Sequence, residues 1–360
     1  MSTSPFANVV FDEATPDQRK RTWEDNGAVW AGPLTLKEYI ARESTLAQTP
    51  QCQDGNCRYW VLYHRDDPLD IISSCETHRK KIFVRPRRGA GGETKELDAY
   101  SVASVHTHPK YRARGMAGYL LGNVLDFLDA RVQWSFLYSD IGRQYYAQMG
   151  WNMFRAEQMT MSVIEPGFVV PERVKLVRGA GPDVRELCER DAVALRARIT
   201  ALPEDGKTHV AMVPTYEQIS WQHTSANFSA VHIAGRPVAN VGAVVSSGES
   251  WVLWYHDFHE RELKIQRVVA LDEAKAVDDI RDLFEAACVE AGAWGFKDVV
   301  AWGPGETVTL GAKALANGPR GYVKLVWNDR LEYSLPSLRW TDDADAGEVV
   351  WHESEYYSWC

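Results

Sequence analysis

The chain has 360 residues, 45% of them hydrophobic, and a formal net charge of −9 at pH 7. This length allows two hydrophobic cores, and the negative charge argues against a general nucleic-acid-binding protein, which needs a basic surface. No apolar run is long enough to span a bilayer, and the N-terminus lacks the basic and apolar segments of a secretion signal, so we expect neither membrane insertion nor secretion.

The six cysteines are scattered along the chain and form no paired C-x-x-C site, which favours a reduced, cytoplasmic setting and no metal. Cys52 and Cys57 are near enough in sequence to bridge or to share a metal. No second pair completes a tetrahedral ligand set, however, and we expect neither a bridge nor a metal at this position.

The first predicted elements are a helix and two strands. Hydrophobic residues at helical spacing predict a helix over residues 35–46, with Thr35 and Glu38 forming a capping box, and this helix could close over a site. Strands are predicted over residues 59–63 and 69–75, where a sheet begins.

A basic segment follows. Residues 78–88 contain six lysines and arginines and precede a glycine-rich stretch, a pattern that predicts an exposed loop. Such a loop would either aid solubility or attract the phosphates of a ligand to an acidic protein.

Residues 111–118 join a predicted strand at 100–107 to an amphipathic helix through a turn of small residues. A helix N-terminus presents unpaired N–H groups and a partial positive charge, so this turn can hold the oxygens of a pyrophosphate. The alternative is that Gly115, Gly118 and Gly122 are small so that a neighbouring element can pack closely. Neither a P-loop nor a Rossmann spacing is present, which disfavours nucleotide hydrolysis and hydride transfer. The residues predicted to bind phosphate are Arg112, Ala113, Arg114, Gly115, Met116, Ala117 and Gly118.

Two motifs in order resemble the GNAT acetyltransferase superfamily. The acyl-CoA signature Q/R-x-x-G-x-G/A is matched by Arg112, Gly115 and Ala117, and the segment aromatic-Tyr-x-x-x-Gly-aromatic is matched by residues 145–151. Three further segments resemble the fungal lysine N-acetyltransferase family: residues 74–77, 137–142 and 357–360. The resemblance implies that acetyl-CoA donates acetyl to the side-chain amine of free lysine, by direct attack through a tetrahedral intermediate.

The resemblance also implies roles for individual residues. In the superfamily, the backbone of the strand before the turn pairs with the pantetheine arm and polarises the thioester, which implies Val105, His106 and Thr107 here. Tyr146 matches the tyrosine that protonates the departing thiolate, and a phenol can serve as this acid.

The base that deprotonates the amine stays open. Ser101 stands at a strand position that often carries Glu or His in relatives, and a hydroxyl alone cannot take the proton. The candidates are Glu76, Asp140 or a chain of water molecules. A strand-edge charge and a capping carboxylate are the structural alternatives for Glu76 and Asp140.

The second half repeats the order of the first. Beyond a Pro- and Gly-containing boundary at 166–171, strands are predicted over 231–245, 250–255 and 263–269, then a helix over 275–291 and a strand over 298–302. The turn at 269–273 carries acidic residues and no glycine, so it should repel phosphate. We therefore predict an α/β (α+β) protein: residues 1–165 form a GNAT fold with a mixed, largely antiparallel sheet, and residues 172–360 form a GNAT-like domain without the acyl-CoA turn that shapes the substrate site.

The last residues, 351–360, are aromatic and acidic, and we expect this tail to dock rather than fray. Simple packing would explain docking, but we expect the tail to enter the groove between domains, where Glu355 or the Cys360 carboxylate binds the substrate ammonium or takes its proton. The predicted partner is a small amine, most simply lysine. Polyamines, amino-sugars and toxic amino-acid analogues are alternatives, as is a non-enzymatic acyl-CoA-binding scaffold.

Overall fold

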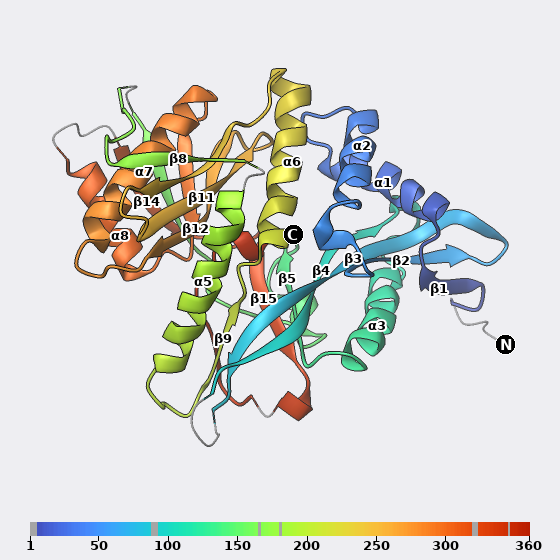
Figure 1. Cartoon of the computed structure of the whole chain (residues 1–360). Coiled ribbons are helices and arrows are strands. Elements are labelled where there is room, and N and C mark those ends of the chain that lie inside the picture. The colour runs from blue at the N-terminus through green and yellow to red at the C-terminus, as the bar shows by residue number, and fades with distance from the viewer. Residues whose placement is uncertain (1–5, 88–92, 165–166, 180–181, 319–322, 345) are drawn as a thin grey trace.

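The computed structural model describes residues 6–87, 93–164, 167–179, 182–318, 323–344 and 346–360. It is a mixed α/β structure with two lobes, each built on a mixed sheet, and helix α6 (Tyr216–Ala234) stands between them (Figure 1). This arrangement confirms the predicted fold class.

The first sheet has the strand order β1-β2-β3-β4-β5-β15-β6, with β9 on β3 and β16 on β9. The β4–β5 and β16–β9 pairs are parallel and the other pairs are antiparallel. Its strands are β1 (Val9–Glu13), β2 (Cys57–His64), β3 (Asp67–Arg85), β4 (Lys95–Thr107), β5 (Trp134–Ser139), β6 (Asn152–Met153), β9 (Thr208–Met212), β15 (Leu335–Trp340) and β16 (Val349–Trp351). The helices of this lobe are α1 (Pro16–Trp30), α2 (Leu36–Leu46), α3 (Met116–Asp129) and α4 (Gln144–Ala147).

The second sheet has the order β14-β7-β13-β12-β11-β10-β8, with a parallel β12–β13 pair. Its strands are β7 (Glu157–Val163), β8 (Val174–Arg178), β10 (Asn240–Val245), β11 (Ser250–Asp257), β12 (Glu262–Ala270), β13 (Asp298–Trp302) and β14 (Val323–Asp329). Helices α7 (Ala276–Ala293) and α8 (Glu306–Ala316) pack on each other and close its core, and α5 (Pro182–Ala201) runs beside α6.

Strands cross between the lobes in both directions. β7 precedes the predicted boundary at 166–171 but pairs with β13 and β14 of the second sheet, whereas β15 comes late in the chain and lies between β5 and β6 of the first. A shared core joins side chains of both sheets, among them Trp134 and Phe136 from β5 and Trp251 from β11. The sheets therefore do not divide where the sequence suggested a domain boundary.

The predicted helix over 35–46 is confirmed as α2, and its capping box is present: Thr35 Oγ1 accepts from the Glu38 N–H, and Glu38 accepts from the Thr35 N–H at 2.8 Å. The expectation of a strand from residue 231 is wrong over its first residues, because α6 continues to Ala234. It ends at Gly235, which adopts φ 68°.

The predicted loop at 78–88 is also wrong as far as Arg85. These residues continue β3, and the side chains of His78, Lys80 and Arg85 are buried. Distant partners make this possible: Lys80 Nζ donates to Gln218 Oε1 of α6, and Arg85 Nη1 donates to the Pro203 carbonyl at 3.2 Å. The glycine-rich stretch at residues 89–92, which was expected to follow in the same loop, lies outside the described residues.

Cys52 and Cys57 form a disulfide, against the expectation of reduced thiols. A short 3-10 turn over Pro50–Cys52 returns the chain beside the start of β2 and brings the two Cα atoms within 4.5 Å. No helix in the described part of the chain is both long and apolar enough to cross a bilayer.

Candidate active site

The turn between β4 and α3 leaves a helix N-terminus open. Ala113 and Gly115 adopt φ values of 59° and 76°, a left-handed geometry that suits glycine, and the helix begins at Met116. Gly115 occupies the N-cap position and has no side chain to accept a hydrogen bond from the first turn. The N–H groups of this turn therefore stay available to a ligand.

The glycines of α3 are not small for close packing. A Cβ added at Gly118 or Gly122 would meet no heavy atom within 4 Å, and at Gly115 the nearest atom is Phe6 Cζ at 3.9 Å. This finding argues against the packing alternative and leaves space for a ligand. Arg114 is exposed, while Arg112 Nε donates to the Thr107 carbonyl at 3.0 Å and braces the end of β4.

A bulge in β4 exposes backbone next to this turn. Ser104 adopts φ 52°, and the pairing of β3 with β4 shifts register between Ser74 and Glu76. On its other edge, β4 pairs with β5 only over residues 99–102. The main chain of residues 103–107, which includes Val105, His106 and Thr107, therefore has an edge free of ladder hydrogen bonds. Such an edge can pair with an extended amide-containing ligand.

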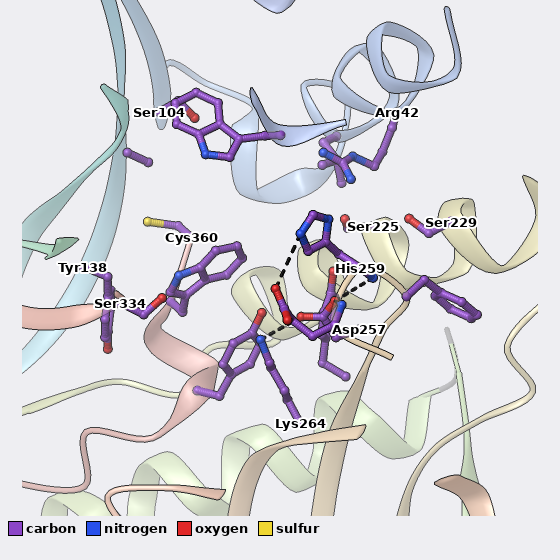
Figure 2. Close-up of a pocket in the computed structure, with 18 of the residues that line it drawn as sticks. Arg42, Ser104, Tyr138, Ser225, Ser229, Asp257, His259, Lys264, Ser334 and Cys360 are labelled. Carbon is purple, nitrogen blue, oxygen red and sulfur yellow. Dashed lines mark hydrogen bonds and ion pairs between the residues drawn. The ribbon is translucent and has the colours of Figure 1, made fainter. Parts of the chain in front are cut away.

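A cavity of about 590 Å³ lies between the lobes at this bulge (Figure 2). Val102, Ala103 and Ser104 of β4 line one side, α2 and α6 another, and the ends of β11 and β12 a third. The end of the tail completes the wall through Tyr356, Trp359 and Cys360.

Carboxylates outnumber lysine and arginine side chains in the cavity wall. Lys264 Nζ is bound by two of them, at 2.7 Å from Asp257 and 3.3 Å from Glu262. An excess of negative charge in a partly enclosed space favours a cationic ligand. The carboxylates are Glu43, Glu76, Asp140, Asp257, Glu260 and Glu262, and the Lys and Arg side chains are Arg42 and Lys264.

Of the predicted acid and base residues, Glu76 and Asp140 line the cavity and Tyr146 does not. Glu76 pairs in register with Ala103 at the bulge, and its Oε2 lies 3.1 Å from His78 Nε2. Burial lowers the pKa of His78, which keeps this imidazole neutral. Asp140 accepts from the Ser334 N–H at 2.8 Å, and burial raises the pKa of its carboxyl.

Tyr146 is 8% exposed and lies in the core between α3 and the first sheet. Its ring makes edge contacts with Tyr145 and Trp151, at centroid distances of 5.2 and 6.1 Å. Burial raises the pKa of its phenol well above the ordinary value, so the hydroxyl keeps its proton at neutral pH.

The tail docks as expected, held by glutamines of α6. Gln218 and Gln222 donate through Nε2 to the Trp359 carbonyl at 2.8 and 2.7 Å. Cys360 lines the cavity, and its Sγ lies 3.1 Å from Ser101 Oγ.

The structure does not support the predicted substrate contact of Glu355. Its carboxylate accepts from Arg267 Nη1 at 3.0 Å and from the Val268 N–H at 3.1 Å, and Glu355 is absent from the wall of the large cavity. Arg267 of β12 is buried and also donates to Asp191 of α5. These contacts therefore fix the tail to β12 and α5. Glu355 is therefore a docking residue.

Sequence reasoning expected the helix over residues 35–46 to close over a site, but it assigned none of its residues to the wall. Tyr39, Arg42, Glu43 and Leu46 line the cavity, and their spacing of i, i+3, i+4 and i+7 places them on one helix face. That spacing was the available signal. Asp257 and Lys264 were missed because only the fold brings the ends of β11 and β12 to the bulge of β4. Among the described residues, no group of His, Cys, Asp or Glu could hold a metal ion.

Comparison with known proteins shows the family of this chain. A family model described as the LYC1 GNAT-like C-terminal domain matches residues 148–360. A lysine acetyltransferase of Yarrowia lipolytica (strain CLIB 122 / E 150) is 23% identical over 333 residues, which cover 79% of this chain and 81% of that protein.

Solved structures share the fold. A GCN5-related N-acetyltransferase from Kribbella flavida superposes with a TM-score of 0.55 at 15% identity, over 93% of this chain and 72% of that one. A putative acetyltransferase from Pyrococcus horikoshii gives a TM-score of 0.54 at 11% identity, over 99% and 96% of the two chains.

Proposed function

The chain belongs to the LYC1 GNAT-like family and is a GNAT acetyltransferase, and from this premise we propose that it acetylates the side-chain amine of free lysine or a close analogue with acetyl-CoA. The observation that carries the proposal is the acidic cavity at the β4 bulge, because it offers a cationic amine a place beside the strand edge that can hold a thioester. The similarity to a lysine acetyltransferase supports the choice of amine.

The residues of the turn fit acetyl-CoA. The uncapped N-terminus of α3 and the empty space at Gly118 suit a pyrophosphate, and Arg112 and Arg114 add positive charge beside it. The free edge of Val105, His106 and Thr107 suits the amides of the pantetheine arm. An N–H of this edge would polarise the thioester carbonyl and stabilise the developing oxyanion.

Two proton transfers complete the reaction. A free lysine ammonium has a pKa of about 10.4, so it must lose a proton before it can attack. We assign this step to Glu76, because it faces the cavity at the bulge itself, with Asp140 as the second candidate. We also assign protonation of the departing thiolate to Tyr146, because it matches the tyrosine that does so in the superfamily; its buried phenol lies outside the cavity wall. Cys360 would contact the amine from the tail side of the cavity.

The test is a panel of amines incubated with purified protein and acetyl-CoA, with thiol release followed and products identified by mass spectrometry. We expect lysine to be acetylated on its side-chain nitrogen with the highest kcat/KM. Thiol release with none of the amines would refute the transferase proposal, and preference for another amine would refute the lysine assignment.

Polyamines are the second candidate, because the cavity wall carries more carboxylates than cations and a polyamine has no carboxylate of its own. The spermidine arm of the same panel decides between them. A kcat/KM for spermidine above that for lysine would favour this alternative.

A further inference from the structure

Helix α2 brings an adjacent ion pair, Arg42–Glu43, to the cavity wall, and the proton transfers described above do not use it. We propose that this pair is a clamp for the two charges of an α-amino acid: Arg42 binds the α-carboxylate of the substrate, and Glu43 binds its α-ammonium. The proposal rests on the proposed function and specifies its substrate class as free amino acids that carry a second, side-chain amine.

The hydrogen bonds of the pair leave the required groups available. Arg42 Nε and Nη2 both donate to one oxygen of Glu43, Oε1, at 2.9 and 2.8 Å. Within the described part of the chain, no hydrogen bond is formed by Glu43 Oε2. Arg42 also interacts with the Tyr39 phenol, and its five N–H groups leave further donors for a ligand. One end of the pair can therefore donate to a carboxylate while the other accepts from an ammonium.

The pair does not hold the fold together as most buried ion pairs do. Its members are neighbours in one helix, so their mutual bond ties no second element to α2. The side chains are 18% and 14% exposed, and removing two charges from water costs free energy that this single contact does not clearly repay. Binding a charged ligand through the remaining donors of Arg42 and the second oxygen of Glu43 would account for this buried pair.

Arg42 is also pre-positioned. Its guanidinium lies 4.8 Å from the ring centroid of Tyr39, which orients its plane. Tyr39 packs with Trp23, Cys57 and Tyr59 in a small core beneath the helix. A side chain fixed in this way loses little conformational entropy when it binds a ligand.

Arg42 differs from Lys264, the other Lys or Arg side chain of the wall, in its position and in how far its charge is already neutralised. Lys264 is already bound by Asp257 and Glu262, so it offers little to an incoming carboxylate. Figure 2 shows Arg42 on the α2 side of the cavity, away from Ser104 and Cys360. An amino acid whose α-groups meet Arg42 and Glu43 would therefore direct its side chain toward the β4 bulge, where acetyl transfer is proposed.

The test compares three amines that differ only at the α-carbon: lysine, 1,5-diaminopentane, which lacks the carboxylate, and Nα-acetyllysine, which lacks the α-ammonium. We expect the unmodified enzyme to prefer lysine. Arg42→Gln should lower kcat/KM for lysine by about tenfold or more, mainly through KM, and leave 1,5-diaminopentane nearly unchanged. Glu43→Gln should instead abolish the discrimination against Nα-acetyllysine.

The matched control is Arg21→Gln, which removes an arginine from an exposed ion pair with Glu24 on α1 and should change none of these ratios. Because either single variant leaves one charge of the pair unpartnered, the double variant Arg42→Gln/Glu43→Gln is measured too, and thermal denaturation verifies folding. It should lose both preferences.

Equal losses for lysine and the diamine in Arg42→Gln would overturn the clamp while leaving lysine acetylation intact. If the unmodified enzyme releases no thiol with any amine, the proposed function fails, and calorimetric titration of lysine and the diamine still tests the clamp. Equal affinity for the two ligands, or use of a non-amino-acid amine alone, would overturn it.

Discussion

Two strand–turn–helix junctions occupy corresponding places in the two lobes, β4 to α3 in the first and β12 to α7 in the second, and they treat the helix N-terminus in opposite ways. At β4–α3 the N-cap is a glycine without a capping side chain. At β12–α7 the first turn carries Asp278 and Asp279, and Ser250 Oγ donates to Asp279 at 2.7 Å.

Arg173 completes the second junction by binding Asp279 and Asp282. The protein's own carboxylates thus take the place near the helix dipole that an anionic ligand would take. The comparison teaches that the fold supplies a potential anion site in both lobes, and that side chains of the first turn decide whether a ligand can use it.

The largest effect that would sharpen this comparison concerns Tyr146. Helix α4 follows β5 as α8 follows β13, but no residue of α8 is a tyrosine. Replacing Tyr146 by Phe should lower kcat by about 100-fold or more, because the departing thiolate loses its proton donor. KM for acetyl-CoA should hardly change.

Steady-state rates measure the Tyr146 effect, and Tyr145→Phe on the neighbouring ring is the control. An unchanged kcat in Tyr146→Phe would remove the phenol from the reaction while leaving the cofactor turn untouched.

The difference between the two junctions can be removed by placing an acidic residue, as found in the first turn of α7, in the first turn of α3. Gly118→Asp puts a carboxylate into the first turn of α3, and we expect about 100-fold weaker binding of acetyl-CoA, since like charges repel at a site built for phosphate. Stability should change little, because a Cβ there meets no atom within 4 Å.

Calorimetric titration of acetyl-CoA measures this loss. The control is Gly122→Asp, one turn further along α3, where the added side chain also meets open space. Equal losses in both variants would show that general charge, and not the helix N-terminus, governs binding.

The second junction is tested by removing the arginine that binds its acids. Arg173→Ala leaves the buried Asp279 without its ion-pair partner and should destabilise the protein by about 2 kcal/mol, a value reduced because Arg173 is 38% exposed. It should create no second acetyl-CoA site, since the acids remain.

Denaturant unfolding compares Arg173→Ala with Arg155→Ala, whose partners Glu157 and Asp329 are exposed. A stoichiometry of two for acetyl-CoA in Arg173→Ala would contradict the interpretation of the acidic turn.

The smallest predicted effect is a pH dependence that belongs to the first junction. Burial and, to a smaller extent, repulsion from Arg112 lower the pKa of His106 to about 4. The end of β12, the corresponding strand of the second junction, carries Val268 and Val269 and has no group that titrates in this way. Between pH 6.5 and 4 the unfolded chain binds more protons than the folded one, so stability is full above pH 6.5 and falls as the pH drops.

His106 should therefore account for about 1 kcal/mol of the stability lost between pH 7 and 5.5. Urea unfolding at both pH values should show a smaller loss for His106→Gln than for the unmodified protein. An identical loss would mean that other groups cause the acid sensitivity.

The parts that sequence alone predicted are those whose signals are local. The glycines of the turn at 111–118 and the capping box at Thr35 and Glu38 act within a few residues, so their positions indicate their structure. Lys80 could not be placed in the same way, because a run of basic residues looks exposed until the partner Gln218 is known.

Glu355 was assigned to the substrate for a related reason. An acid in an aromatic tail is a plausible ammonium ligand until the fold brings it to Arg267, which lies 88 residues away along the chain. The spacing of Tyr39, Arg42, Glu43 and Leu46 shows that they share one face of α2, but the sequence does not show that this face meets a cavity.

The strands exchanged between the lobes restrict how this enzyme can admit its substrate. Many two-lobed enzymes open by a hinge rotation that parts their lobes. Here the chain passes from one sheet to the other over residues 154–156, between β6 and β7, and again over residues 330–334, between β14 and β15. Such a rotation would pull on both short connections and would expose the core that the two sheets share. We therefore expect entry and release to proceed by small local displacements at the rim of the cavity, where the segment joining α1 to α2 contributes Ala31, Pro33 and Leu34 to the wall.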